Sequence, residues 1–301
     1  MGVRFKPYTP DDLVRVRDFL SGIYTALGRP NCWLIDRWEF VIYFQETQNG
    51  TLKRWEQCAG LWEREDGGLA GVACRDGDMY FQFDTLEPDG RMVDEMLGFA
   101  ERCAKEEGAA LAQVCIPDGL KALENAAKAR GYAPTGSFDE VNGMELTKAS
   151  AGRYPVRIPQ GFRLCAGDEA DDRSKALGHI HAFGYAADPR AELTLHTYGN
   201  LRNAPDYDPE LDLCLLNEAG DVVSFCNIFY DRANRIGSLE PVGTHAGYRR
   251  LGLARALLHE GFKRLMDKGA VKVFTGPSQP FYEQIGFRRV VTMNQWESPA
   301  L

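Results

Sequence analysis

The stretch Arg249-Arg-Leu-Gly-Leu-Ala254 decides how the second half of this chain folds. It follows residues 236–244, which have the composition of a strand, and it opens a run in which apolar residues recur at helical spacing from Ala254 to Met266. A glycine where a helix follows a strand lets the backbone approach an anion, and the free N–H groups of the first helical turn then face that anion. The sequence therefore predicts an anion-binding turn around Gly252.

Three arginines surround this turn: Arg249, Arg250 and Arg255. Cations are normally unfavourable at the N-terminal end of a helix, where the helix dipole is positive. The arginines therefore predict a negatively charged ligand at this position. Close packing of the helix on the strand is an alternative explanation for Gly252 alone.

Two further segments complete the pattern. Residues 270–275 are predicted to form a short strand, and Phe281-Tyr-Glu-Gln-Ile-Gly-Phe287 is predicted to end a short helix. With these segments the second half resembles the GNAT superfamily of N-acetyltransferases. Arg249, Gly252 and Ala254 match its motif Q/R-x-x-G-x-G/A, and residues 281–287 match its later F-Y-E-x-x-G-F segment.

The resemblance implies an α/β fold with a central, mostly antiparallel sheet that splays at its fourth and fifth strands. It also implies acetyl-CoA as co-substrate and no metal, with the backbone amides of residues 250–255 holding the pyrophosphate. Val242 and Thr244 would pair through their backbone with the pantetheine arm, as an added strand does. The implied cofactor-binding residues are Val242, Thr244, Arg249, Arg250, Leu251, Gly252, Leu253, Ala254 and Arg255. The sequence departs from the family at Thr275, where many members carry Asn.

Acetyl transfer to an amine requires one proton to leave an ammonium and another to reach a departing thiolate. Glu240 lies on the strand beside the expected thioester carbonyl, and we expect it to be the base, directly or through a water molecule. Tyr282 matches the family's phenol near the thioester sulfur, and we expect it to be the acid. A surface carboxylate and a packed helix tyrosine remain the alternative interpretations of these two residues.

The first half repeats the plan of the second. Each half has an opening strand, an acidic helix start, an antiparallel pair joined by a charged glycine turn, a long helix, a strand and a short helix. Each short helix ends in a glycine and an aromatic residue, at Gly131-Tyr132 and at Gly286-Phe287. This order predicts two tandem domains, 1–150 and 151–301, joined near Lys148 to Pro155. Chance similarity of two α/β domains is the alternative.

The first half lacks the residues that carry the chemistry. Residues 86–91 fall where the anion-binding turn would stand, and Glu87 and Asp89 there would repel a pyrophosphate. Ala127 stands in the place of Tyr282. We expect the first half to be a degenerate GNAT-like domain that does not bind coenzyme.

Composition narrows the classes of function. The chain has 301 residues and a net charge of −8, which argues against nucleic acid as a partner. No apolar run approaches the roughly 18 residues of a membrane span, so we expect a cytoplasmic protein with no membrane partner. The 8 cysteines include no C-x-x-C pair and are interpreted as buried apolar residues in a reducing compartment. The aromatic-rich residues 33–38 and 43–44 are interpreted as core.

The predicted function is transfer of an acetyl group from acetyl-CoA to a primary amine of a small molecule. Asp206 and Asp208, in a polar loop expected over residues 197–208, are predicted to attract a cationic amine. A protein or peptide N-acetyltransferase and a non-catalytic acyl-CoA-binding sensor remain alternatives, and Tyr282 favours an enzyme. No motif encodes the acyl-chain length or the oligomeric state, so a homodimer stays open.

Overall fold

The computed structural model describes residues 2–147 and 152–301. Lys148–Ala151, the first part of the predicted junction, lies outside the described residues. The chain divides into two compact units, neither of them continuous in sequence. Unit 1 comprises Met1–Leu34, Leu52–Asn142 and Gly276–Leu301, and unit 2 comprises Ile35–Thr51 and Gly143–Thr275.

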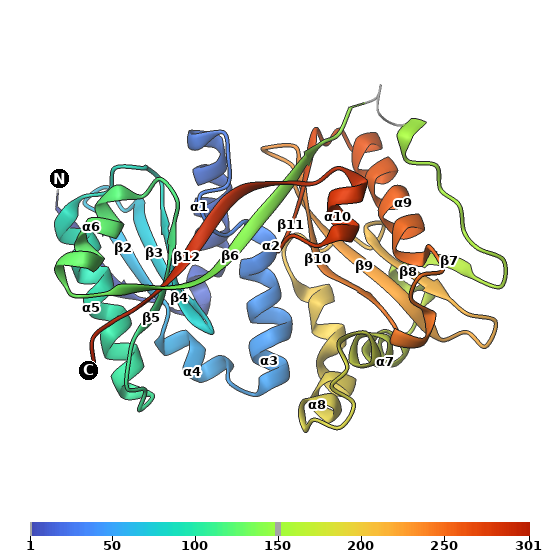
Figure 1. Cartoon of the computed structure of the whole chain (residues 1–301), viewed down its shortest axis with the longest axis horizontal. Coiled ribbons are helices and arrows are strands. Elements are labelled where there is room, and N and C mark those ends of the chain that lie inside the picture. The colour runs from blue at the N-terminus through green and yellow to red at the C-terminus, as the bar shows by residue number, and fades with distance from the viewer. Residues whose placement is uncertain (1, 148–151) are drawn as a thin grey trace. The chain divides into compact units, whose positions relative to one another are not determined.

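Unit 1 is built around the strand order β1-β2-β3-β4-β5-β12-β6 (Figure 1). Its neighbouring strands pair antiparallel from β1 to β4 and between β5 and β12, while β4 and β5 are parallel. Its elements are β1 (Val3–Pro7), a 3₁₀ turn (Pro10–Asp12), α1 (Leu13–Leu27), α4 (Leu52–Gln57), β2 (Gly60–Arg64), β3 (Leu69–Asp76), β4 (Asp78–Phe83), α5 (Gly90–Glu106), β5 (Gln113–Pro117), α6 (Lys121–Ala129), β6 (Ala133–Glu145), α10 (Pro280–Ile285) and β12 (Arg288–Glu297).

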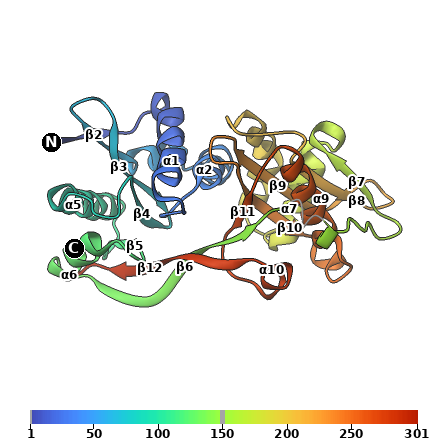
Figure 2. The ribbon, with the colours of Figure 1, turned by 90° about the horizontal axis from the view of Figure 1, so that it is seen from above.

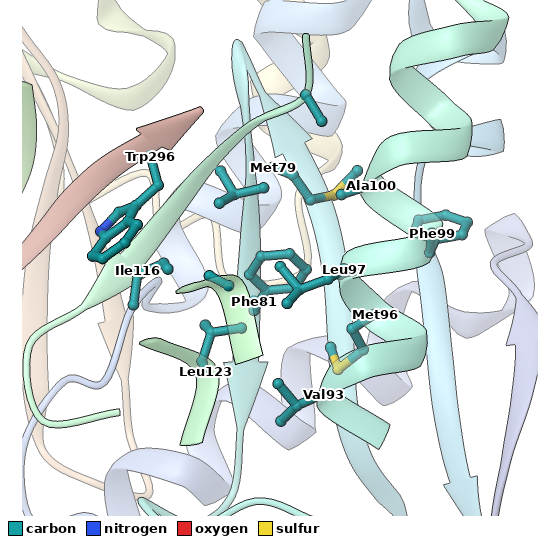
Figure 3. Close-up of a cluster of buried hydrophobic side chains, with 14 of the residues drawn as sticks. Met79, Phe81, Val93, Met96, Leu97, Phe99, Ala100, Ile116, Leu123 and Trp296 are labelled. Carbon is teal, nitrogen blue, oxygen red and sulfur yellow. The ribbon is translucent and has the colours of Figure 1, made fainter. Parts of the chain in front are cut away.

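The core of unit 1 lies between its sheet and α5. Apolar residues three and four apart place Val93, Leu97 and Ala100 on one face of this helix, and all three are buried. Figure 3 shows these side chains beside Phe81 of β4, with Trp296 of β12 in the same cluster. Each fully buried valine, leucine or phenylalanine side chain stabilises the fold by about 1.5–3 kcal/mol.

Unit 2 has the strand order β6-β11-β10-β9-β8-β7, with β10 and β11 parallel and β7 to β10 antiparallel. Its elements are α2 (Ile35–Phe40), a π-helical turn (Val41–Gln45), α3 (Glu46–Asn49), β7 (Arg163–Ala166), a 3₁₀ turn (Gly167–Glu169), α7 (Asp172–Phe183), α8 (Arg190–Thr197), a 3₁₀ helix (Tyr198–Asn203), β8 (Asp212–Leu216), β9 (Val222–Asp231), β10 (Ile236–Thr244), a 3₁₀ turn (Ala246–Tyr248), α9 (Leu253–Asp267) and β11 (Lys272–Thr275).

The two repeats follow the same order of elements, which confirms the predicted α/β class and its mixed sheets. The series β1, α1, β2, β3, β4, α5, β5, α6 and β6 recurs as β7, α7, β8, β9, β10, α9, β11, α10 and β12. The predicted splay is also present in the second repeat. β10 pairs with β11 only from Ile236 to Leu239, although β10 continues to Thr244.

The last strand of each repeat departs from the predicted division. β12, from the second repeat, pairs with β5 of the first between Met293–Glu297 and Gln113–Pro117. β6, from the first repeat, has β12 and β11 as neighbours, and Figure 2 shows β6 and β12 side by side. A boundary at residue 150 therefore separates the sequence repeats but not the compact units. Backbone hydrogen bonds let a strand join any free sheet edge, so a local pattern does not encode which edge it joins.

The segment Ile35–Thr51 comes from the first repeat and belongs to unit 2. Its Trp38 and Phe44 are fully buried, as the interpretation of these aromatic residues as core predicts. The Phe44 ring packs on His179, with ring centroids 4.7 Å apart, and on Tyr198 at 5.4 Å. Phe44 is therefore part of the core of unit 2.

All 8 cysteines lie among the described residues, where they are buried and form no disulfide, as expected for apolar packing residues. Across residues 2–147 and 152–301, no helix is long and apolar enough to cross a membrane. In the same residues no group of three or more His, Cys, Asp or Glu side chains is placed to hold a metal ion.

Candidate active site

The turn between β10 and α9 has the backbone that its glycine predicts. Gly252 lies directly before α9 with φ of 85°, in the left-handed region that favours glycine, and Arg250 also has a positive φ of 68°. A side chain at Gly252 would meet no atom within 4 Å, so the space beside it is open.

The start of α9 offers free donors. No side chain caps this helix, and the Ala256 amide makes an early helical hydrogen bond, to the Gly252 carbonyl at 3.0 Å. The amides of Leu253, Ala254 and Arg255 precede it and have no carbonyl of their own helix to bind. This uncapped helix start fits the anion that the sequence predicts.

The three arginines at this turn are exposed, and within the described residues none of them pairs with a carboxylate. Arg249 instead donates to the Ala182 carbonyl at 2.7 Å and to the Thr244 carbonyl at 3.3 Å. It thereby ties the turn to the end of α7 and to β10. Arg250 and Arg255 leave uncompensated positive charge beside the start of α9, which favours an anionic ligand.

A neighbouring histidine, His245, also belongs to this turn. Burial lowers the pKa of His245, and the nearby His181 and Arg249 side chains lower it further. The His245 ring accepts a hydrogen bond from the Gly247 amide at 3.0 Å and so helps to shape the turn. The sequence did not predict this hydrogen bond, because a lone histidine belongs to no motif that indicates its partner.

The exposed edge of β10 lies where the pantetheine arm is expected. Val242 and Thr244 pair with Cys226 and Ser224 of β9 on one side. On the other side, the pairing with β11 ends at Leu239 and Thr275, and among the described strands none covers the remainder. The backbone of β10 can therefore accept an added strand here.

Pro241 interrupts the strand, as its missing N–H predicts. The β9–β10 register shifts between Leu239 and Val242. Asn227 donates to the freed Glu240 carbonyl at 3.2 Å. The bulge sets the direction of the Glu240 side chain, whose carboxylate lies 3.5 Å from the Arg37 guanidinium.

Arg37 is a site residue that sequence reasoning missed. It lies in α2, about two hundred positions before Glu240, and the aromatic residues around it gave only a core signal. Nothing in the spacing of either residue indicates that they meet.

Tyr282 lies in α10 of unit 1, whereas Glu240 and the helix start lie in unit 2. The residue is 8% exposed, and its ring packs on Phe281 and Phe287, with centroids 5.3 and 5.6 Å away. Its carbonyl accepts from the Gly286 and Phe287 amides at 3.1 Å. The ring is thus packed between two phenylalanines of the same segment.

The polar loop predicted over residues 197–208 is largely helical. α8 reaches Thr197 and a 3₁₀ helix continues to Asn203. Asp208 is buried and pairs with Lys268 at 2.9 Å and Arg232 at 3.6 Å, so its charge is compensated within the protein. Its expected attraction for a cationic amine is accordingly weakened.

The first repeat has a counterpart of the α9 start at α5. There Asp89 caps the helix and accepts from the Arg91 amide at 3.0 Å and the Met92 amide at 3.1 Å. The protein's own carboxylate thus occupies the donors that α9 leaves open. The two helix starts therefore differ in whether a side chain caps them.

These features define a class of protein: an α/β fold in which a splayed strand pair leads into an uncapped, arginine-rich helix start. Residues 177–287 match the sequence model of the acetyltransferase (GNAT) family. This part of the chain is thus similar to the GNAT acetyltransferases, and the match supports acyl transfer from an acyl-CoA donor.

Solved structures resemble the whole chain. A GCN5-related N-acetyltransferase from Sphaerobacter thermophilus aligns with a TM-score of 0.62 and 18% identity, over 99% of this chain and 97% of that one. A tandem GNAT protein from the clavulanic acid biosynthesis pathway aligns with a TM-score of 0.67 and 13% identity, over 99% and 98%. At these identities the likeness concerns the fold. No curated protein matches the chain.

Proposed function

We propose that this chain transfers an acetyl group from acetyl-CoA to a primary amine of a small molecule. The observation that carries the proposal is the start of α9, where helix-start amides, an open space at Gly252 and exposed arginines meet. The pyrophosphate of coenzyme A has the charge and size for such a site. The family match over residues 177–287 supports an acyl-CoA donor independently.

In this proposal the backbone of residues 250–255 holds the pyrophosphate, and Val242 and Thr244 pair with the pantetheine arm. Glu240 takes a proton from the substrate ammonium, directly or through a water molecule, and the neutral amine then attacks the thioester carbonyl. Tyr282 gives a proton to the departing thiolate. No metal is needed, because the reaction requires only proton transfers and a polarised carbonyl.

The first repeat is proposed to have lost coenzyme binding. Asp89 caps α5 with a negative charge at the place where the pyrophosphate would lie. Ala127 stands where the second repeat has Tyr282. One functional coenzyme site per chain follows from this interpretation.

Thiol-release kinetics with acetyl-CoA and a panel of amines test the proposal. The panel contains polyamines, amino acids, aminoglycosides and lysine-containing peptides. We expect turnover with at least one small amine and release of one thiol per acetylated amine. Turnover with peptides alone would show that the acceptor is a protein or peptide and not a small molecule. Tight acetyl-CoA binding without turnover of any amine would favour a non-catalytic sensor.

A further inference from the structure

The segment Ile35–Thr51 brings charged side chains of the first repeat to the strand that carries Glu240. The Asp36 carboxyl is buried, and its helix α2 packs on β10. Arg37 pairs with Glu240, with Nη1 and Oε2 3.5 Å apart. The segment therefore contributes a guanidinium to the immediate surroundings of the candidate base.

Besides Glu240, the Arg37 guanidinium contacts Gln45 and Phe40. Its Nη2 donates to Gln45 Oε1 at 3.1 Å, and its planar group lies 5.6 Å from the centre of the Phe40 ring. The Arg37 and Glu240 side chains are 27% and 24% exposed. A pair so shielded from water interacts more strongly than an exposed one.

The neighbouring ionisable groups have other partners. α7, which also packs on β9 and β10, directs Lys175 to Asp212 at 2.6 Å and His179 to Tyr185 at 2.7 Å. In α2, Glu39 accepts from the Asp206 amide at 3.0 Å. Arg37 of α2, in contrast, pairs with Glu240.

We propose that Arg37 is a positioning residue for Glu240: its fixed guanidinium keeps the carboxylate ionised and oriented for proton transfer. This inference rests on the proposed function, in which Glu240 takes the proton of the ammonium. It assigns the first repeat a function in the reaction of the second, because α2 carries Arg37 into unit 2.

The pH dependence of kcat tests the proposal. In Arg37→Gln the Glu240 carboxylate loses its positive neighbour, which raises the pKa of Glu240. We therefore expect the acidic limb of the pH–kcat profile to move to higher pH by roughly one unit, and kcat at a pH within that limb to fall about tenfold. Arg37→Lys keeps the charge and returns the limb toward the wild-type position. Adding Arg37→Gln to Glu240→Gln causes no further shift, because the affected group is already gone.

Arg264→Gln is the matched control. Arg264 is also 27% exposed and pairs with Glu260 of unit 2 at 2.7 Å, and its loss leaves the acidic limb in place. A limb that stays fixed in Arg37→Gln would overturn the proposal. So would an equal change of kcat when Glu240 is already replaced, because Arg37 would then act on something else.

A second measurement does not depend on turnover. The protein is labelled with ¹³C in its glutamate side chains, and the carboxyl resonance missing from Glu240→Gln is assigned to Glu240. We expect this resonance to titrate at higher pH in Arg37→Gln than in wild type or Arg264→Gln. If no amine is acetylated but the titration of the Glu240 resonance moves, the proposed function is wrong and the effect of Arg37 on Glu240 is confirmed. If the titration does not move, the positioning role of Arg37 is wrong.

Discussion

Gly252 shows at the scale of one residue how the backbone prepares a ligand site. A β-branched residue that adopts the Gly252 φ of 85° has a strained backbone, which destabilises the turn. A side chain at this position would also project into space that the protein leaves open. Gly252→Val should therefore weaken acetyl-CoA binding by more than tenfold, equivalent to about 1.4 kcal/mol. Isothermal titration calorimetry measures this change directly.

Gly28→Val is the control for backbone strain. Gly28 has a φ of 67°, also in open space, but it caps α1 in unit 1. This variant should lose stability without a loss of acetyl-CoA affinity. Equal acetyl-CoA affinities in Gly252→Val and wild type would show that the pyrophosphate does not bind at this turn.

Glu240 gives the second prediction. Glu240→Gln keeps the size of the side chain and removes its ability to take a proton, so kcat should fall and the acidic limb of the pH–rate profile should disappear. The measurement is the pH dependence of thiol release with a productive amine. If the mutant keeps the wild-type profile, the amine loses its proton by another route.

Tyr282 gives the third. A phenol has an ordinary pKa of about 10, so it can donate a proton at pH 7, and such donation typically contributes about 10²–10⁴-fold to a rate. Tyr282→Phe removes only the oxygen and keeps the ring contacts with Phe287. We expect kcat to drop while the melting temperature and acetyl-CoA affinity stay close to wild type. Equal turnover would assign Tyr282 to packing.

At the scale of the element, α7 carries a histidine that affects stability. Burial lowers the pKa of His179 to about 3, whereas an unfolded chain has a histidine pKa of about 6.5. Between these values the unfolded chain binds the proton and the folded protein does not. The free energy of unfolding therefore falls as the pH falls below about 6.5, by up to about 1.4 kcal/mol per pH unit from this group.

His179→Gln should remove this contribution and leave a partner for Tyr185. Urea unfolding at pH 7, 6 and 5 should show a smaller loss of stability on acidification in the variant than in wild type. His196→Gln is the control, because His196 is exposed and pairs with Glu192. Parallel curves for His179→Gln and wild type would show that His179 is protonated in the folded protein.

The elements themselves follow from local sequence. Period-two and helical patterns together with glycine turns predicted the order of strands and helices in both repeats, and Pro241 predicted the break in β10. The helix start at Gly252 was predicted because all its determinants are adjacent in sequence. The helical turns over residues 198–203 were missed, because polar residues favour loops unless tertiary contacts hold them.

At the scale of the whole molecule, the features that sequence reasoning missed are contacts between distant segments. The pairing of β12 with β5 depends on backbone bonds that any strand offers. The Arg37–Glu240 pair joins α2 to β10, and the sequence around neither residue indicates that the two meet. The two repeats thus exchange a strand and a helical segment, which a division at residue 150 does not capture.

The most direct test of the account is the stoichiometry of acetyl-CoA binding to the full chain, measured by calorimetry in wild type, Gly252→Val and Gly90→Val. Gly90 begins α5 behind the Asp89 cap and, like Gly252, has open space beside it. We expect one site per chain in wild type and in Gly90→Val, and more than tenfold weaker binding in Gly252→Val. Two equal sites, or binding weakened by Gly90→Val and not by Gly252→Val, would contradict it.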